Sequence, residues 1–253
     1  SRLLQRVRAF AGEALWGEAV GRGRRFLGYV AAIDTLPPQP RLAQPKPRPD
    51  PALFPRSLSV TEVETLVRDP YSIFARHVLG LDPLDPLAAQ PGASDRGSIV
   101  HDIFARFSAR FPEGLPAFDV AVEYLDSVAY EAFAPIIDTY PELYAEWWPR
   151  YERMANAYLP WEVERRAGLR QVHPEIYGRW EIPMGRETFT LRARADRIER
   201  RADGSACIVD FKTGLPPSNR EVFAGFSPQL TLEAAMLMAG AFKGFPPTKS
   251  APD

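Results

Sequence analysis

The sequence predicts a mixed α/β fold, α+β in the order of its elements, with helices first, then three strands and a final helix. Three observations lead to this prediction. Apolar residues recur at helical spacing through most of 57–167. Alternating or short apolar runs, typical of strands, follow in 175–184, 187–201 and 206–214. Helical spacing then returns in 227–242.

The composition is that of a globular protein and excludes several kinds of site. The 253 residues are 45% hydrophobic and 25% charged, with a formal net charge of −1, so nucleic-acid binding would need a local basic patch. The single cysteine, Cys207, excludes a disulfide framework, a cysteine zinc site and a self-contained iron–sulfur site. We expect it to be a buried strand residue. No long apolar run and no signal peptide are recognisable, so we expect a cytoplasmic protein without a membrane span.

Three regions are expected along the chain. Residues 1–35 predict a helical segment that its arginines make basic, which is either a solvated helix face or a contact to DNA or another subunit. Residues 36–56 are too rich in proline for a helix or a central strand and predict an extended linker. Residues 57–253 then form the main domain.

Helix signals are clear in the first half of this domain. Ser59 and Glu62 form a capping-box pattern at the start of its first helix, and Pro70 is expected to end that helix. An amphipathic helix is expected over 93–111. The long helical stretch 118–167 is rich in tryptophan and tyrosine, and we interpret these aromatic residues as core packing rather than a ligand site.

The last two strands are expected to form a hairpin through the turn Ala202–Ser205. The second of them, CIVDFKTG, carries Asp210 and Lys212 in an otherwise apolar run. Side chains alternate along a strand, so both charges lie on one face and Phe211 lies on the other, toward the core. Taken alone, the pair is best explained as an ion pair at a wet strand edge, because buried ion pairs are seldom stabilising.

A third charge changes this interpretation. Asp196 lies on the neighbouring strand, and the hairpin can bring it within metal-bridging distance of Asp210. Two carboxylates that lie close together repel each other unless a cation lies between them. Glu175, on the first strand, is a further acidic candidate or, equally, an exposed residue at the strand edge.

Two polar residues on helices complete the candidate set. His101 lies in the 93–111 helix, with Gly97 one turn earlier on the same face, where backbone or substrate could approach the imidazole. Gln229 lies near the start of the last helix, which we expect Ser227 to cap, with Pro228 in the first turn. Taken singly, such a histidine is usually a core or surface residue, and such a glutamine is a cap or a surface amide.

In this order, G-x-x-x-H, an aspartate, D-x-K and a helical glutamine resemble the RecB-type branch of the PD-(D/E)XK nucleases. SLSVTEVETLVRDPYSIFARHVLGLDPLD, RARADRIER, IVDFKTG and PQLTLEAAML are similar to the C-terminal nuclease domain of AddB, a subunit of the AddAB helicase–nuclease that processes double-strand breaks for recombination. The likeness covers 57–242. It implies a restriction-endonuclease-like core, a mixed sheet flanked by helices, with a large helical insertion.

The resemblance also implies an activity and a set of roles. The chain would be a Mg²⁺-dependent deoxyribonuclease, with Mn²⁺ as a substitute, that hydrolyses single-stranded DNA beside an AddA-like helicase partner. Lys212 would hold or activate the attacking water and stabilise charge on the phosphate, and Gln229 would position the substrate or Lys212. The implied metal ligands are His101, Asp196, Asp210 and the carbonyl of Phe211.

Two departures from the family pattern have consequences. Many members bind an iron–sulfur cluster through four cysteines, but Asp69 stands at one of these positions, so no such cluster is expected. The family has another strand after the glutamine helix, whereas only KGFPPTKSAPD follows here, so the domain is expected to be truncated.

The alternative function is a catalytically inert module that clamps DNA or braces a partner subunit. The arginines beside Asp196 line a DNA path or form a solvated face: Arg192, Arg194 and Arg197.

Overall fold

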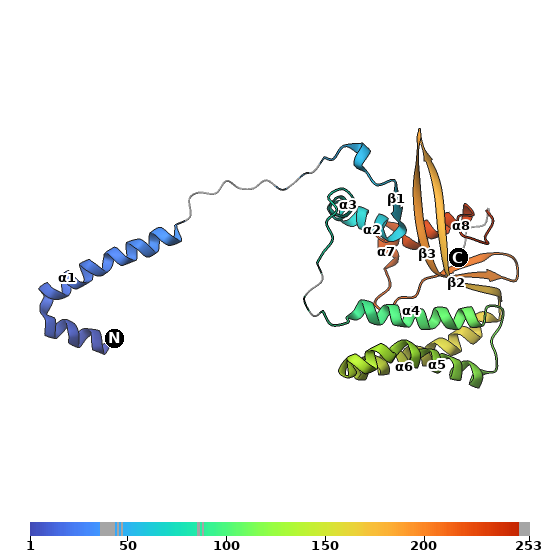
Figure 1. Cartoon of the computed structure of the whole chain (residues 1–253), viewed down its shortest axis with the longest axis horizontal. Coiled ribbons are helices and arrows are strands. Elements are labelled where there is room, and N and C mark those ends of the chain that lie inside the picture. The colour runs from blue at the N-terminus through green and yellow to red at the C-terminus, as the bar shows by residue number, and fades with distance from the viewer. Residues whose placement is uncertain (36–43, 45, 47, 85–86, 88, 248–253) are drawn as a thin grey trace. The chain divides into compact units, whose positions relative to one another are not determined.

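The computed structural model describes residues 1–35, 44, 46, 48–84, 87 and 89–247, and the chain divides into two compact units, Ser1–Arg48 and Pro49–Asp253. The first unit contains the expected helix, α1 (Arg2–Asp34), which is interrupted at Gly12, where φ is 76° (Figure 1). Residues 36–43, 45 and 47 of the linker predicted over 36–56 lie outside the described residues. In the described part of the chain, no helix is long and apolar enough to cross a membrane.

The second unit is built on a four-stranded mixed sheet, which confirms the predicted fold class. Its long central strand β3 (Glu187–Arg201) is antiparallel to β2 (Leu169–Met184) along one edge. The other edge of β3 pairs with two short strands, β1 (Ser57–Ser59) in parallel and β4 (Ala206–Val209) in antiparallel orientation. On this edge, β1 pairs with β3 as far as Arg192, and β4 pairs with it from Arg197 onward. Between these two positions, this edge of β3 has a gap in its pairing.

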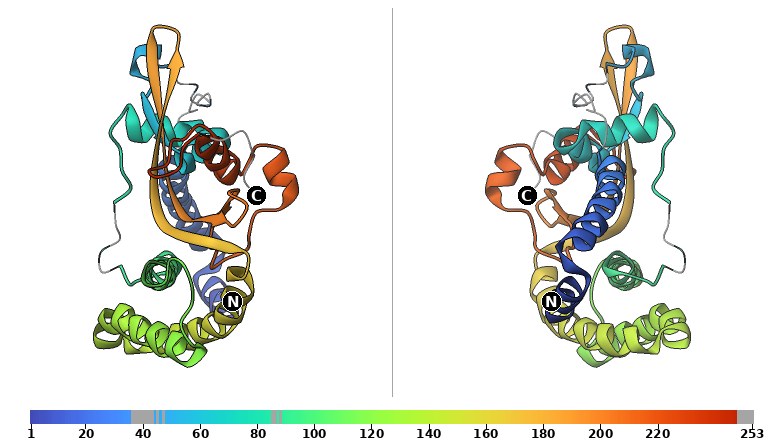
Figure 2. Two further views of the ribbon diagram at one scale, coloured as in Figure 1. Left: turned by 90° about the vertical axis from the view of Figure 1, so that its right-hand side faces the viewer. Right: turned by 90° about the vertical axis from the view of Figure 1, so that its left-hand side faces the viewer.

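Two helical layers cover the sheet. One contains α4, α5 and α6, whose apolar side chains form a core of their own, and Figures 1 and 2 show these helices together, away from the Met184–Glu187 end of the β2–β3 hairpin. The other core joins β3 to α2, α8 and the segment after α8. The bounds of the helices are η1 (Pro51–Leu53), α2 (Val60–Arg68), α3 (Pro70–His77), α4 (Ala93–Arg110), α5 (Phe118–Thr139), α6 (Pro141–Arg166), α7 (Asn219–Phe223) and α8 (Gln229–Met238).

The capping box predicted at the start of α2 is confirmed, and the structure adds two further details of the helix ends. Ser59 and Glu62 form both hydrogen bonds of the capping box at the start of α2. Asp69 caps α3, because its side chain accepts a hydrogen bond from the backbone of Tyr71. The helical stretch 118–167 divides at Tyr140, between α5 and α6.

Other local predictions were wrong or incomplete. Pro228, rather than Ser227, stands at the N-cap of α8, and the Ser227 hydroxyl donates to Glu64 on α2 instead. β1 and α7 were not predicted, because segments of three and five residues carry too little periodicity. The segment after α8 forms one antiparallel bridge, from Phe242 to Gly178 on β2, where a Cβ on Gly178 would lie 2.7 Å from the Phe242 ring.

A buried ion network joins α6 to β3. Arg197, with no exposed side-chain surface, pairs with Glu162 on α6 at 2.7 Å and with Glu199 at 2.9 Å. Arg166 and Arg165 complete the network by pairing with Glu162 and Glu199, respectively. Both interpretations of Arg197, as part of a DNA path and as part of a solvated face, are therefore wrong, because its guanidinium is buried between β3 and α6.

Candidate active site

The β3–β4 hairpin places two carboxylates opposite each other. Arg197 pairs with Val209, so the next positions along the two strands are Asp196 and Asp210. Asp196 lies in the gap of β3 that neither β1 nor β4 covers, and Asp210 follows directly after β4. The backbone N–H of Phe211 donates to Oδ2 of Asp196 at 2.8 Å, which ties the chain after β4 to β3. The juxtaposition expected from the hairpin is present.

Lys212 and Gln229 both contact Asp210. Nζ of Lys212 lies 2.7 Å from Oδ2 of Asp210, and Nε2 of Gln229 donates to Oδ1 at 2.9 Å. The Gln229 carbonyl oxygen also accepts from Lys212 at 3.3 Å. The three side chains thus form a closed triangle in which the carboxylate is almost fully buried and the ammonium remains 40% exposed.

His101 contacts the other carboxylate. Its Nδ1 lies 3.3 Å from Oδ2 of Asp196, across from α4 to β3. The hydrogen bond with Asp196 raises the pKa of His101 against partial burial. Burial opposes ionisation of Asp196, but hydrogen bonds from His101 and the Phe211 N–H outweigh it and lower the pKa of this carboxyl.

Gly97 explains how α4 comes so near. A Cβ at this position would lie 3.3 Å from the Thr213 hydroxyl, closer than an ordinary contact, so Thr213 would have to shift slightly to admit a larger residue. The G-x-x-x-H spacing thus lets α4 approach the Thr213 side chain one turn before His101.

Phe211 anchors the site from behind. Its ring packs against Phe104, Tyr158 and Trp161, with centroid separations of 5.6, 6.1 and 6.2 Å. These residues belong to the α4–α6 core, so the chain that carries Asp210 is held against the helical insertion. The prediction that Phe211 faces the core is confirmed.

The donor chemistry fits a hard divalent cation. Burial, with the charge of Asp196 adding to it, raises the pKa of Asp210 despite the contact with Lys212, so a further positive charge would stabilise the carboxylate. Each carboxylate oxygen has two lone pairs, so its present hydrogen bonds leave room for a cation. In the described ranges, no three His, Cys, Asp or Glu side chains are grouped as a preformed metal site. Two of the predicted ligands instead have other partners: Asp196 contacts His101, and Asp210 contacts Lys212.

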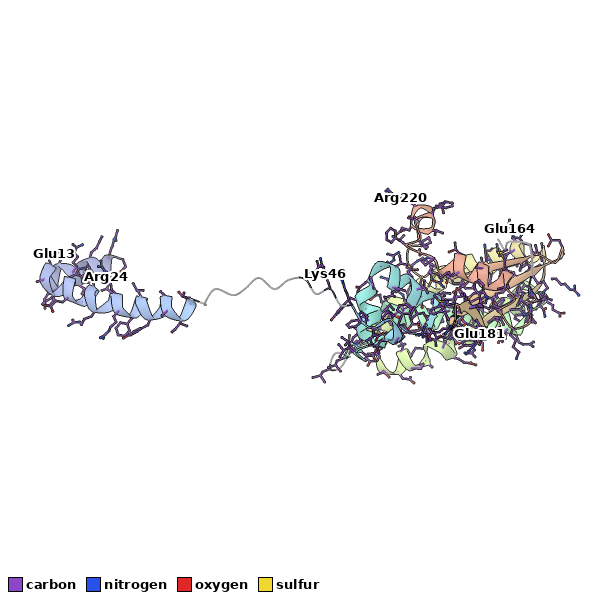
Figure 3. The ribbon with its side chains drawn as sticks, turned by 90° about the horizontal axis from the view of Figure 1, so that it is seen from above. Glu13, Arg24, Lys46, Glu164, Glu181 and Arg220 are labelled. Atoms are coloured by element: carbon purple, nitrogen blue, oxygen red, sulfur yellow. The ribbon has the colours of Figure 1, made fainter. Side chains whose placement is uncertain are left out.

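Two cavities open onto the two halves of the site. One, of about 590 Å³, is lined by Gly97, His101, Asp196 and Glu175. The other, of about 580 Å³, is lined by Asp210, Lys212, Gln229 and residues before α7, among others. α7 projects beside the second cavity, with Arg220 at the surface (Figure 3).

Glu175 lies at the first cavity in an unusual backbone conformation. Its φ is 55°, the only positive value among the described residues other than glycine. Its carboxylate pairs with Arg194, and burial raises its pKa against that contact. The prediction of an exposed edge acid does not describe this position, because the side chain is half-buried and faces the cavity of His101 and Asp196.

Glu233 is the site residue that sequence reasoning missed. It lies on α8, one turn after Gln229, and its carboxylate accepts from the same Nε2 that donates to Asp210. The sequence does carry a signal for it: Glu233 follows Gln229 by four residues, and residues four apart on a helix lie on one face. It was overlooked because a glutamate in an apolar helix normally faces solvent.

Comparison with known proteins gives a family and a set of relatives. A family model described as the PD-(D/E)XK nuclease superfamily matches residues 57–251. An uncharacterized protein of Rickettsia conorii is 29% identical over 206 residues, which cover 78% of this chain and 24% of that protein. An uncharacterized protein of Rickettsia felis is 29% identical over 192 residues, which cover 75% and 22%. The chain therefore spans about a quarter of the length of these relatives.

Proposed function

Because the chain belongs to the PD-(D/E)XK nuclease superfamily, we propose that it is a metal-dependent deoxyribonuclease that hydrolyses phosphodiester bonds of single-stranded DNA. One observation carries this proposal: Asp196 and Asp210 lie next to the last pair of the β3–β4 hairpin, near enough for their charges to interact, with Lys212 and Gln229 in direct contact with Asp210. The arrangement combines two acidic oxygen donors with one compact cation at the mouth of a cavity.

Each residue of the proposed site has a part that follows from its contacts. Asp196, Asp210, the Phe211 carbonyl and His101 would hold Mg²⁺, or Mn²⁺ in its place, which supplies Lewis-acid polarisation of the phosphate when bound. Lys212 is a half-exposed point charge that can contact a phosphate oxygen and the attacking water. Gln229 fixes the ammonium by accepting from it.

The DNA strand is proposed to lie across the sheet beside this site. Arg192 and Arg194 are both more than half exposed and line a cavity of about 890 Å³ together with Tyr177 and Gln229. Each arginine also contacts a glutamate, so part of its charge is already neutralised. Contacts from these side chains to phosphates would be independent of base sequence.

We further propose that the domain works in a helicase–nuclease that prepares double-strand breaks for recombination, beside an AddA-like subunit. The support is the likeness of four sequence stretches to AddB and the greater length of the relatives, in which the matched region is only about a quarter. Co-purification of the full-length protein with an AddA-like helicase from cells that express both tests this assembly, and separation of the two during purification would contradict it.

The activity can be tested with end-labelled DNA. The chain, with Mg²⁺ or Mn²⁺, is expected to degrade single strands faster than duplexes, and Asp210→Asn and Lys212→Ala are each expected to slow cleavage at least about 100-fold, because such groups contribute several kcal/mol to the transition state. Initial rates of fragment release at saturating metal measure this effect.

A matched control separates charge loss at the site from charge loss elsewhere. Glu181→Gln removes one negative charge from an exposed position on β2 (Figure 3) and should leave the rate unchanged. Cleavage by Asp210→Asn at the rate of Glu181→Gln would exclude the proposed site. DNA binding without cleavage by the unmodified chain would favour the inert clamping module.

A further inference from the structure

Glu233 is a buried carboxylate beside the proposed site that no proposed catalytic step uses. It is 1% exposed, on the first turns of α8. Oε1 accepts from Nε2 of Gln229 at 3.3 Å. Oε2 is buried and, in the part of the chain that the structure describes, has no hydrogen-bond partner.

The contact with Glu233 helps to determine which way the side-chain amide of Gln229 points. Nε2 of Gln229 carries two hydrogens, and its two contacts are acceptors, Oδ1 of Asp210 at 2.9 Å and Oε1 of Glu233 at 3.3 Å. The amide oxygen is thereby left to face Lys212. Rotation of the amide by 180° would set its oxygen against two carboxylates and its NH₂ against an ammonium.

Glu233 is a costly residue to keep in this position. Burial, with the charges of Asp210 and Asp196 adding to it, raises the pKa of Glu233 to about 7. An apolar side chain would fill the same space next to Met236 and Leu237 without that cost. A purely structural role therefore gives no reason for a polar side chain here, whereas Gln229 needs an acceptor oxygen at this position.

We propose that Glu233 is a positioning residue, which holds the Gln229 amide so that its oxygen faces Lys212 and its nitrogen faces Asp210. The proposal rests on the proposed nuclease function for its effect on rate, but the geometry does not depend on that function. Glu233 acts through Gln229, and it touches neither the substrate nor the cation.

A double-mutant cycle tests the effect on rate. Glu233→Leu is expected to lower kcat about 10- to 100-fold with little change in KM, as is typical when a residue that orients a catalytic group is lost. Glu233→Gln keeps an acceptor oxygen and is expected to restore most of the activity. In a Gln229→Ala background, Glu233→Leu should change kcat less than about 2-fold, because the two residues act as one unit. Additive losses, or a Gln variant as slow as the Leu variant, would overturn the proposal.

A measurement without catalysis tests the geometry alone. In the ¹⁵N-glutamine-labelled chain, the side-chain amide signal that disappears in Gln229→Ala should exchange slowly with solvent, and Glu233→Leu should accelerate this exchange at least about 10-fold. Met236→Ala, a buried change on the same helix, should leave it nearly unchanged. Unaltered exchange in Glu233→Leu would refute the contact even in an active enzyme. If the chain cuts no DNA but the exchange accelerates as expected, the proposed function fails and the positioning contact stands.

Discussion

Burial and the charge of Asp196 raise the pKa of Asp210, and the direct contact with Lys212 opposes this rise. The hairpin was sufficient to predict that Asp196 and Asp210 lie near each other, but the strand expected over 206–214 ends at Val209, so strand alternation does not account for the contact of Lys212 with Asp210. The hairpin could not show that Lys212 and Gln229 would share Asp210, because that depends on where α8 packs. For the same reason, the burial of Glu233 and Arg197 was not predicted: their contacts join elements that are distant in the sequence.

Glu233 predicts a measurable pH dependence of stability. Its folded-state pKa of about 7 lies above the ordinary value of 4.5, so the folded state binds more protons than the unfolded state between these two pH values. The free energy of unfolding should fall as pH rises through this window. Glu233→Gln, which cannot ionise, should gain stability relative to the parent by up to about 3 kcal/mol between pH 5 and pH 8.

Urea denaturation in the presence of EDTA measures this difference, because the chelator removes cations that would stabilise the nearby carboxylates. Groups that do not interact with Glu233 contribute equally in both proteins and cancel, whereas the charges of Asp196, Asp210 and Lys212 act on Glu233 itself and belong to the measured difference. If the glutamine variant were more stable than the parent by the same free energy at pH 5 and at pH 8, the pKa of Glu233 would not be raised in the folded state.

At the scale of elements, the helical insertion supports the site from behind. Phe211 packs into the α4–α6 core, and the ion network of Arg197 fixes α6 to β3 one residue away from Asp196. The helices themselves were predictable from apolar spacing and tryptophan content. β1 was not, since its three residues acquire strand structure only by pairing with β3, and the resulting gap beside Asp196 is a property of tertiary structure.

The network predicts a large effect of one buried substitution. Glu162→Ala removes a carboxylate that both Arg166 and Arg197 contact, and it leaves Arg197 to share Glu199 with Arg165. It is expected to lower the free energy of unfolding by about 3–5 kcal/mol. Glu164→Ala, two residues away on the same helix and exposed (Figure 3), should change it by less than about 0.5 kcal/mol. Equal effects of the two substitutions in chemical denaturation would show that the network contributes nothing.

At the scale of the whole molecule, the fold class, the family and the order of the site residues were all readable from the sequence. The order of the motifs identified the superfamily. Each motif alone is a weak signal, but four of them in the right order along the chain are together specific for this superfamily. The expected final strand is represented, in the residues that the structure describes, by the single bridge from Phe242 to Gly178. The segment 248–253 lies outside the described residues, and α1 belongs to a separate compact unit.

The central claim is that Asp196 and Asp210 hold a divalent cation with Lys212 beside it. Crystals of the chain soaked in Mn²⁺ test this most directly, because the anomalous scattering of manganese locates the ion independently of any activity. We predict a peak within coordination distance, about 2–2.5 Å, of carboxylate oxygens from both aspartates, lost in Asp210→Asn. Crystals in which Mn²⁺ binds only elsewhere, or in which Asp210 stays paired with Lys212 alone at saturating Mn²⁺, would contradict the claim.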